Sequence, residues 1–252
     1  MFDFLFRKRK PLPLPYRREL HCHIVPGVDD GASDIDFSID YLRFLEASGV
    51  ERIVFTPHHT YPKFLNTPEG VEPVYRKLVD RMQAEGLKMQ AEGFSFEYRL
   101  DETFFELLAA GKRGTPECRI RPLRGRTLLI EEAWQQPVSG LEELIDDLQR
   151  DGYDPILAHP ERYPYWTKRH DKYDHLQEIG LAFQCNILSF AGYYGDDVRK
   201  TALWMLRQGY VNFLGSDLHN RHHVELIEAF LRSRDYAAIR QDLVDSIEND
   251  KP

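Results

Sequence analysis

The sequence of 252 residues has few cysteines, no long apolar run and no excess of basic residues. Three cysteines, an odd number, are too few for the disulfide framework of a small secreted protein. Nowhere do about 18 apolar residues follow one another, so no membrane-spanning helix is expected. The 33 Lys and Arg residues against 41 Asp and Glu residues give a net charge of −8, which argues against non-specific nucleic-acid binding. These shortages favour a cytoplasmic protein.

The N-terminus lacks the order of a secretory signal, because its apolar residues precede its basic residues. We expect residues 1–16 to form an N-terminal tail and residues 17–252 to form a single domain. The aromatic and basic side chains of residues 2–10 could make weak contact with an anionic membrane surface. A frayed tail before a proline-rich lead-in is the simpler interpretation.

Seven short apolar segments alternate with segments of helical periodicity. The expected strands are residues 19–24, 52–56, 95–100, 127–131, 155–158, 182–187 and 211–215. Apolar residues three and four apart predict helices, among them residues 36–48, 141–150 and 197–208. The alternation predicts an α/β fold with a parallel sheet, since parallel neighbours need a crossover connection. Both a barrel and an open doubly wound sheet fit seven units, but no GxGxxG dinucleotide motif follows the first strand.

Histidines and carboxylates follow most of these strands at their carboxyl ends. In a barrel of parallel strands these ends meet on one face, where active sites are built. His21 and His23 lie two residues apart, as do Asp217 and His219, and alternate residues of a strand point to the same side. The candidate metal ligands are His21, His23, Asp30, His58, Glu97, Glu131, His159, Asp217 and His219.

A set of imidazoles and carboxylates without thiolates suits manganese, iron, cobalt or zinc. Because a catalytic zinc takes about three protein ligands, this set indicates two or three ions that share a carboxylate such as Glu97. Each residue alone has a structural explanation, such as a hydrogen-bonded histidine at a strand end. Burying all of them together without cations would be prohibitive, which favours a metal cluster. His59, His222 and His223 flank the site and could contact a substrate.

These motifs resemble the PHP (polymerase and histidinol phosphatase) family. Within it the chain is most similar to the bacterial manganese-dependent protein tyrosine phosphatases encoded with capsule and exopolysaccharide export systems. The resemblance extends from about residue 19 to 220 and implies a distorted seven-stranded, TIM-like β/α barrel. The matching stretches are HCHIVPGVDDG, FTPHHTYP, FEYRLDE, LLIEE, PILAHPERYPYW, FQCNILSFAGYYG and FLGSDLHN.

The resemblance also implies a site for three ions, with manganese as the expected metal. The implied ligands of the first ion are His21, His23, Glu97 and Asp217. Those of the second are the bridging Glu97, His58 and Glu131. Those of the third are Asp30, His159 and His219. Asp30 is preferred to Asp29 because the family's aspartate directly precedes the glycine.

Arg162 resembles the family's phosphate-binding arginine, and its planar fork suits phosphate oxygens. Three departures from the family pattern leave questions. Glu19 stands where the family usually has aspartate. Arg221 follows the Asp217–His219 motif at once, whereas relatives carry an arginine several residues later, so its role as a second phosphate contact stays open. The pair Glu131–Glu132 leaves open which carboxylate faces inward.

The implied reaction is hydrolysis of phosphotyrosine in a protein, with a tyrosine kinase of capsular or exopolysaccharide export as the expected partner. Metal ions lower the pKa of bound water towards about 7 and so supply hydroxide. The tyrosyl leaving group has a pKa near 10 and needs less protonation than an alkyl alcohol. His219 or Asp217 could assist as the acid.

Three alternatives remain at the level of the sequence. The same barrel and metals would serve a phosphatase of histidinol phosphate or another small phosphomonoester. The protein could instead act as a regulatory binding partner of the kinase or export assembly. Finally, Cys118 and Arg124 have the spacing of a cysteine-based tyrosine phosphatase, but their loop holds no glycine and Pro122 removes an amide donor.

Overall fold

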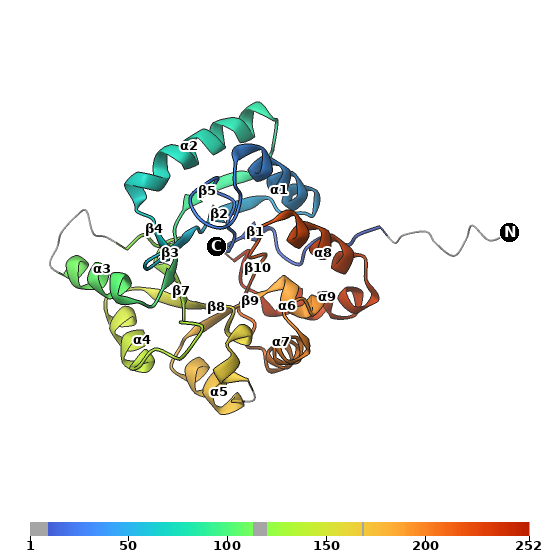
Figure 1. Cartoon of the computed structure of the whole chain (residues 1–252). Helices are drawn as coiled ribbons and strands as arrows, with labels where there is room; N and C mark the ends of the chain where they lie inside the picture. The colour runs from blue at the N-terminus through green and yellow to red at the C-terminus, as the bar shows by residue number, and fades with distance from the viewer. Residues whose placement is uncertain (1–9, 113–119, 168, 252) are drawn as a thin grey trace.

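The strands occupy the centre of the molecule and the helices surround them (Figure 1). The computed structural model describes residues 10–112, 120–167 and 169–251. The strands are β1 (Arg18–Glu19), β2 (Arg52–Phe55), β3 (His58–Thr60), β4 (Phe64–Leu65), β5 (Gln90–Phe94), β6 (Glu97–Arg99), β7 (Thr127–Glu131), β8 (Asp154–Ala158), β9 (Ala182–Asn186) and β10 (Phe213–Gly215). They form a three-stranded sheet of order β1-β2-β5 and a seven-stranded sheet of order β10-β9-β8-β7-β6-β3-β4.

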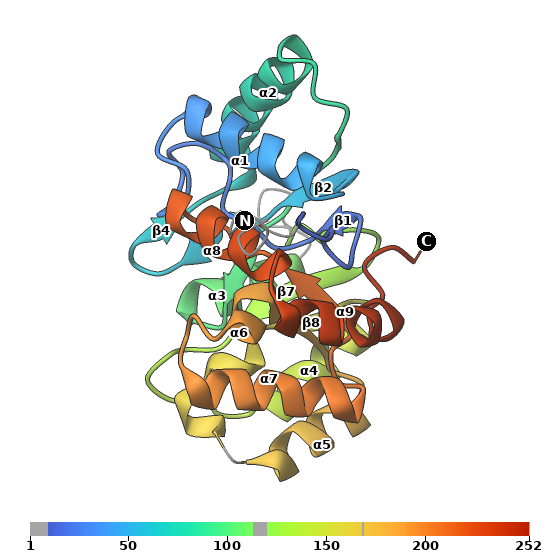
Figure 2. The same cartoon turned by 90° about the vertical axis from the view of Figure 1, so that its right-hand side faces the viewer.

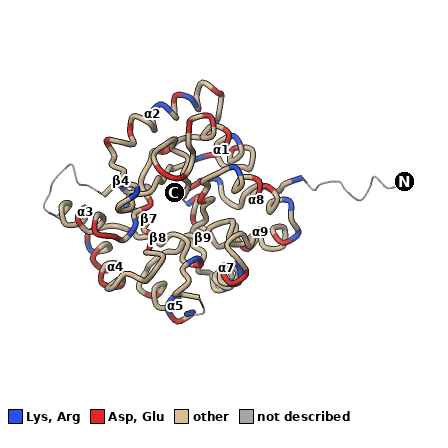
Figure 3. Tube along the Cα trace, in the orientation of Figure 1, with Lys and Arg blue, Asp and Glu red and all other residues tan. Residues whose placement is uncertain are grey.

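Most helices lie between consecutive strands, as crossover connections require. The helices are α1 (Ile35–Ala47), α2 (Pro68–Ala84), α3 (Glu102–Lys112), α4 (Leu141–Arg150), α5 (His170–Glu178), α6 (Ile187–Ala191), α7 (Asp196–Gln208), α8 (Arg221–Leu231) and α9 (Arg234–Ser246), with the short 3₁₀ helices η2 (Pro160–Arg162) and η3 (Pro164–Trp166). Figure 2 shows α1 and α2 on one side of the strands and α4, α5 and α7 on the other. Acidic and basic residues are interspersed along the outer helices (Figure 3).

The α/β class with parallel strands is confirmed, because every strand pair except the antiparallel β3–β4 pair is parallel. The predicted strand 127–131 and helix 141–150 coincide with β7 and α4. The prediction of one strand over residues 19–24 was wrong, since β1 ends at Glu19 and Cys22 pairs with Leu218 only as an isolated bridge. The prediction also missed the short strands β3, β4 and β5. The two exposed side chains of β5, Gln90 and Glu92, are polar, so this segment lacks the apolar run that predicts a buried strand.

Backbone hydrogen bonds link the two sheets at two places. The Asp217 amide donates to the His21 carbonyl at 2.9 Å, next to the isolated bridge between residues 22 and 218. At the second place the pairing of β2 with β5 continues into that of β3 with β6: the Ser95 amide donates to the Phe55 carbonyl at 2.8 Å and the Glu97 amide donates to the Pro57 carbonyl at 3.1 Å. These bonds place the ends of strands from both sheets around one shared space.

A small apolar cluster fills the space between the two sheets. Val54 of β2, Leu129 of β7 and Ile156 of β8 belong to this inner cluster. Their strand neighbours Ile53 and Leu128 belong instead to the larger core that packs under the helices. Successive side chains of a strand point to opposite faces, which divides each strand between an inner and an outer apolar layer.

The chain before β1 packs against this body from residue 12 onward. The amides of Leu12 and Leu14 donate to the carbonyls of Leu231 and Ser48, and Leu14 and Tyr16 are buried. The last residues of the expected tail are therefore part of the packed structure. Residues 1–9, with most of the segment proposed to touch a membrane, lie outside the described residues. Within the described residues, no helix has the length and hydropathy needed to cross a bilayer.

Candidate metal centre

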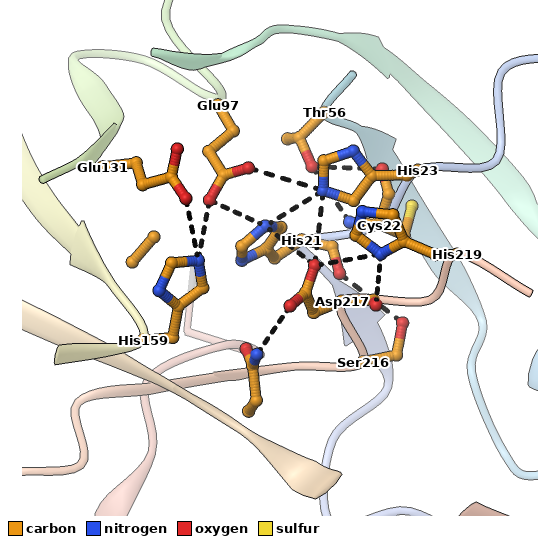
Figure 4. A network of polar contacts seen from close by, with 12 residues as sticks. His21, Cys22, His23, Thr56, Glu97, Glu131, His159, Ser216, Asp217 and His219 are labelled. Atoms are coloured by element: carbon orange, nitrogen blue, oxygen red, sulfur yellow. Dashed lines mark hydrogen bonds and ion pairs between the residues drawn. The ribbon is translucent and has the colours of Figure 1, made fainter. Parts of the chain in front are cut away.

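Histidines and carboxylates from both sheets converge at the carboxyl ends of the strands (Figure 4). They line a cavity of about 560 Å³. The polar and charged residues of its wall are Asp30, His58, Thr60, Lys63, Glu97, Arg99, Glu131, His159, Arg162, Asp217, His219, Asn220 and His223, and the aromatic ones are Phe64, Trp134, Tyr193 and Tyr194. His21 and His23 lie beneath this wall and are fully buried.

Glu19 joins the chain segment that carries His21 to the segment that carries Asp217 and His219. Its Oε1 accepts hydrogen bonds from the amides of Leu20, His21 and Ser216, at 3.0–3.1 Å. The Tyr16 hydroxyl donates to its Oε2 at 2.8 Å. Glu19 thus supports the site by fixing the backbone beside His21 and Asp217.

The backbone around the cluster is tightly constrained. A Cβ atom on Gly31 would lie 1.9 Å from the His23 carbonyl oxygen, so only glycine allows the loop after Asp30 to fold back over the cluster. His159 and Asp217 have φ values of 34° and 49°, a left-handed conformation that is uncommon for residues other than glycine. Such backbone strain concentrates at functional sites, where the surrounding structure enforces it.

Hydrogen bonds orient three of the imidazoles with Nε2 towards the cluster. His23 Nδ1 donates to the Asp29 carboxylate and His219 Nδ1 donates to the Asp217 carbonyl, both at 2.8 Å. His21 Nδ1 lies 2.7 Å from Gln184 Oε1, whose own NH₂ group donates to two other oxygens, so Oε1 is the acceptor. In the neutral imidazole each Nε2 therefore carries the lone pair, as in metal-ligating histidines whose tautomer an outer carboxylate or carbonyl fixes.

Asp217 faces the first pair of histidines. Its Oδ1 lies 3.6 Å from His21 Nε2 and 3.4 Å from His23 Nε2. Its Oδ2 accepts from Arg162 Nη1 and Asn186 Nδ2, each at 2.7 Å. His21, His23 and Asp217 thus form one group that could hold a metal ion.

Glu97 lies at the centre of the cluster, among four imidazoles. Its Oε1 is 3.3 Å from His21 Nε2 and 2.9 Å from His159 Nε2. Its Oε2 is 3.5 Å from His23 Nε2 and 2.9 Å from His58 Nδ1, yet no donor has the geometry to hydrogen-bond this buried oxygen within the described residues. A buried carboxylate oxygen without a donor fits a position that a bridging cation would satisfy.

Of the other groups implied by the resemblance, His58, Glu97 and Glu131 do lie together, whereas the group that contains Asp30 differs. Asp30 lies with His58 and His219, at 3.4 Å and 3.6 Å from their Nε2 atoms, and His23 completes this group. His159 is directed instead towards Glu97 and towards Glu131 Oε1, which is 3.6 Å away. The expected grouping of His159 with Asp30 and His219 is thus not the arrangement that the structure has. His58 belongs to two groups: its Nε2 faces Asp30, and its Nδ1 faces Glu97 in the group that includes Glu131.

Burial and neighbouring charges shift the pKa values of the histidines and carboxylates in this cluster. Burial lowers the pKa of His21, but Glu97 and Asp217 outweigh this effect and raise the pKa to about 9. Burial and the nearby Glu97 raise the pKa of Glu131 to about 7. Burial lowers the pKa of His159 to about 4. Burial and the nearby His23 lower the pKa of His219 to about 4. Without cations the cluster must retain protons on some of its ligands, whereas divalent ions would replace those protons.

Arg162 is the last residue of η2, the short helix that directly follows His159, and forms part of the cavity wall. Its guanidinium stacks over Tyr194 at 4.0 Å and Trp134 at 4.7 Å from the ring centroids. The bond to Asp217 fixes one of its nitrogens. The cation therefore lies beside the candidate metal ligands, where a phosphate group could reach both.

Two residues expected to contact substrate do not line this cavity. His59 alternates with His58 on β3 and faces the opposite side, where its Nδ1 donates to the Asn66 carbonyl at 2.8 Å. Arg221 begins α8 with its side chain 68% exposed and bound to Asp40 at 3.5 Å. Neither prediction matches the observed position, although the neighbouring His223 does line the cavity.

The uncertainty between the two adjacent glutamates is settled by their side-chain directions. Glu131 faces the cavity, whereas Glu132 is buried outside it and accepts the Val138 amide at 2.7 Å. Residues that sequence reasoning missed include Arg99 and Trp134 in the cavity wall and Asp29 beside His23. Arg99 follows Glu97 by two residues, so the alternation of strand side chains could have revealed it.

The thiol alternative receives no support from the described cysteines. Cys22 and Cys185 are buried, and burial raises the pKa of each thiol well above its usual value. A reactive thiolate needs the opposite shift. Cys118 lies outside the described residues, and Arg124 lies at the other end of the strands, where its Nη1 donates to the Lys251 carbonyl.

Comparisons with known proteins show the family of this chain. The family model for capsular polysaccharide synthesis, CpsB/CapC, matches residues 18–228. The tyrosine-protein phosphatase YwqE of Bacillus subtilis is 29% identical over 203 residues, which cover 80% of this chain and 77% of that protein. The tyrosine-protein phosphatase CpsB of Streptococcus pneumoniae is 25% identical over 209 residues, 80% of this chain and 82% of that protein.

Solved structures extend the similarity to the fold. A chain from the crystal structures of B. subtilis YwqE and S. pneumoniae CpsB, described as metal-dependent tyrosine phosphatases, matches with a TM-score of 0.74 and 27% identity. The match covers 92% of this chain and 95% of that chain. The phosphotriesterase homology protein of Escherichia coli matches with a TM-score of 0.51 at 14% identity, which shows a likeness of fold alone.

Proposed function

The chain belongs to the CpsB/CapC family of capsular polysaccharide synthesis, and from this membership we propose that it is a metal-dependent protein tyrosine phosphatase. The observation that carries the proposal is the buried cluster around Glu97, which has the ligand types and orientations of a multi-metal site. The relatives' names supply the substrate class.

We propose that three manganese ions occupy the cluster. The distances favour a first ion between His21, His23, Glu97 and Asp217. They favour a second ion between Glu97, Glu131 and His159, and a third between Asp30, His58 and His219. When bound, divalent ions would supply a hydroxide nucleophile at neutral pH and neutralise charge on the phosphate oxygens.

The protein side chains would bind and orient the phosphate. The free donors of the Arg162 guanidinium would bind equatorial phosphate oxygens, while Asp217 and the two aromatic rings hold the cation in place. Burial raises the pKa of Asp217, but His219, His21 and Arg162 outweigh this and hold the pKa well below its usual range. Asp217 is thus ionised at neutral pH and serves as ligand and anchor rather than as proton donor. The open, aromatic-rimmed cavity would admit a tyrosyl ring behind the phosphate.

Three further elements of the proposal concern the setting of the site. The shared inner cluster and the backbone bonds between the sheets support a distorted seven-stranded barrel formed by both sheets together. We propose a tyrosine kinase of capsule or exopolysaccharide export as the substrate, in keeping with a family of capsular polysaccharide synthesis. We place this reaction in the cytoplasm, which agrees with the scarcity of cysteine.

Hydrolysis by metal-depleted protein tests the proposal. The protein is treated with a chelator, and phosphate release from a phosphotyrosyl peptide is measured before and after addition of Mn²⁺, with histidinol phosphate assayed in parallel. We expect Mn²⁺ to restore release from the peptide and little release from histidinol phosphate. Activity that survives chelation, or turnover of histidinol phosphate alone, would contradict the proposal.

The affinity for Mn²⁺ is expected to rise with pH. In the metal-free protein Glu131 has a pKa of about 7 and His21 a pKa of about 9, so both hold protons in slightly acidic solution. A metal must displace those protons, so binding at pH 7 should release them, and affinity should rise about tenfold per pH unit for each proton displaced. Calorimetric titration between pH 6 and 8, in two buffers of different ionisation enthalpy, measures both effects. An affinity independent of pH would show that the ligands are already deprotonated.

A further inference from the structure

Arg99 is a second arginine in the wall of the candidate active site. It lies on β6, two residues beyond Glu97, and alternate residues of a strand face the same side. Its side chain is 18% exposed, close to the 19% of Arg162. Both guanidinium groups are thus largely buried and border the same cavity.

The two arginines contact the cluster in the same way. Arg162 binds Asp217 Oδ2 and leaves Oδ1 to the histidines. Arg99 binds Glu131 Oε2 through Nε and Nη2, both at 3.0 Å, and leaves Oε1 directed towards His159. Each carboxylate therefore directs one oxygen towards histidines of the candidate metal site and the other towards an arginine. Strand β7, which carries Glu131, lies between β6 and β8, so the arginines approach from opposite sides of that strand.

Arg99 Nη1 is available to donate a hydrogen bond to a ligand in the cavity. Its Nε donates a hydrogen bond to Glu131 Oε2 and its Nη2 forms an ion pair with the same oxygen, whereas Nη1 has no hydrogen-bond acceptor among the side chains and carbonyls that the structure describes. Arginine presents its donors in one plane, so a group anchored through two nitrogens keeps the third in a fixed direction. A phosphate monoester has three non-bridging oxygens, more than the fork of Arg162 alone can bind.

The other cations near the cavity are less suited to this task. Arg221 is 68% exposed, binds Asp40 and lies outside the cavity wall. Lys63 is 68% exposed and lies 3.6 Å from Asp30 at the rim. A cation exposed to this degree is hydrated and screened, and so contributes little to affinity.

We propose that Arg99 is the second phosphate-binding residue of this site and takes the role that the sequence suggested for Arg221. The inference rests on the proposed function, because it assumes that a phosphate group enters beside the metal ions. Arg99 and Arg162 hold the phosphate between them, with the metal cluster beneath. Chains of this family that carry another residue at this position would bind phosphate differently.

The test is the affinity of the Mn²⁺-loaded protein for inorganic phosphate, measured by calorimetry on the wild type and on Arg99→Met. Methionine keeps an apolar stem of similar length and removes the guanidinium. We expect Arg99→Met to retain its bound manganese and to bind phosphate about 10- to 100-fold more weakly, the loss for a hydrogen bond to a charged group. Arg99→Lys keeps the charge without the fork and should show a smaller loss. If Arg99→Met does not fold, the phosphate affinity of Arg99→Lys tests the inference instead. We expect that affinity to be at least about threefold weaker than in the wild type.

The control is Arg126→Met, which removes the same charge just before β7, at the opposite end of the strands, where Arg126 binds the exposed Asp154. It should bind phosphate as the wild type does. Unchanged phosphate affinity in Arg99→Met would overturn the inference, as would a loss that is explained by loss of manganese. Hydrolysis of the phosphotyrosyl peptide by the wild type is measured alongside. Absence of hydrolysis would refute the proposed function, while the binding data would still decide the role of Arg99.

Discussion

Replacement of Glu97 by glutamine is expected to lower kcat by at least about 10³-fold, which corresponds to about 4 kcal/mol of transition-state stabilisation. The side chain keeps its shape but loses its negative charge, and an NH₂ group replaces one oxygen among four imidazoles. A bridging ligand would be lost from two metal positions at once. We therefore expect Glu97→Gln to bind fewer manganese ions than the wild type, as measured by elemental analysis after gel filtration.

The matched control for this variant is Glu92→Gln. Glu92 lies on β5 and binds Arg18 at 2.8 Å, away from the cavity. It should keep both its manganese content and its turnover. Circular dichroism of both variants would show whether the fold is kept. A folded Glu97→Gln protein with the metal content and kcat of the wild type would exclude Glu97 as the bridging ligand.

Replacement of Arg162 by methionine is expected to lower kcat/KM by about 10²- to 10³-fold while the manganese content stays unchanged. The arginine contributes donors to the phosphate but is not itself a metal ligand. Asn186 still donates to Asp217 Oδ2 at 2.7 Å in its absence, so the carboxylate keeps a partner. Steady-state kinetics on a phosphotyrosyl peptide, together with metal analysis, separates the two contributions.

Arg169→Met serves as the control, because Arg169 is exposed and binds only the neighbouring Asp171 among the described residues. Its kinetics should match those of the wild type. An Arg162→Met variant with normal kcat/KM would remove the phosphate-binding role from this residue. A variant that loses manganese would show that Arg162 acts by holding Asp217 rather than by binding phosphate.

A two-residue spacing predicted part of the site from the sequence. His21 and His23 point into one cluster although β1 ends at Glu19, and strand alternation puts Arg99 on the same side of β6 as Glu97. The sequence could not group ligands from different strands, because those distances depend on how the two sheets meet. His159 accordingly lies with Glu97 and Glu131, not with Asp30.

Residue type and position in the sequence predicted the structure less well outside the regular apolar strands and helices. Arg221 follows the last ligand motif directly, yet it starts α8 and points to solvent, because Asn220 caps that helix through the His223 amide. Strand β5 went unnoticed because its exposed side chains, Gln90 and Glu92, are polar and Gly93 interrupts its apolar face. The helix α4 was predicted to the residue because its apolar stripe of Leu141, Leu144, Ile145 and Leu148 is complete.

Anomalous diffraction from crystals grown with Mn²⁺ tests most directly whether the buried cluster around Glu97 is a multi-metal centre. We expect three peaks: one between His21, His23 and Asp217, one beside Glu131 and His159, and one between Asp30, His58 and His219. The first two peaks should lie next to the Glu97 carboxylate. A map with no peak at Glu97, from protein that hydrolyses a phosphotyrosyl peptide, would show that this cluster is not a multi-metal centre.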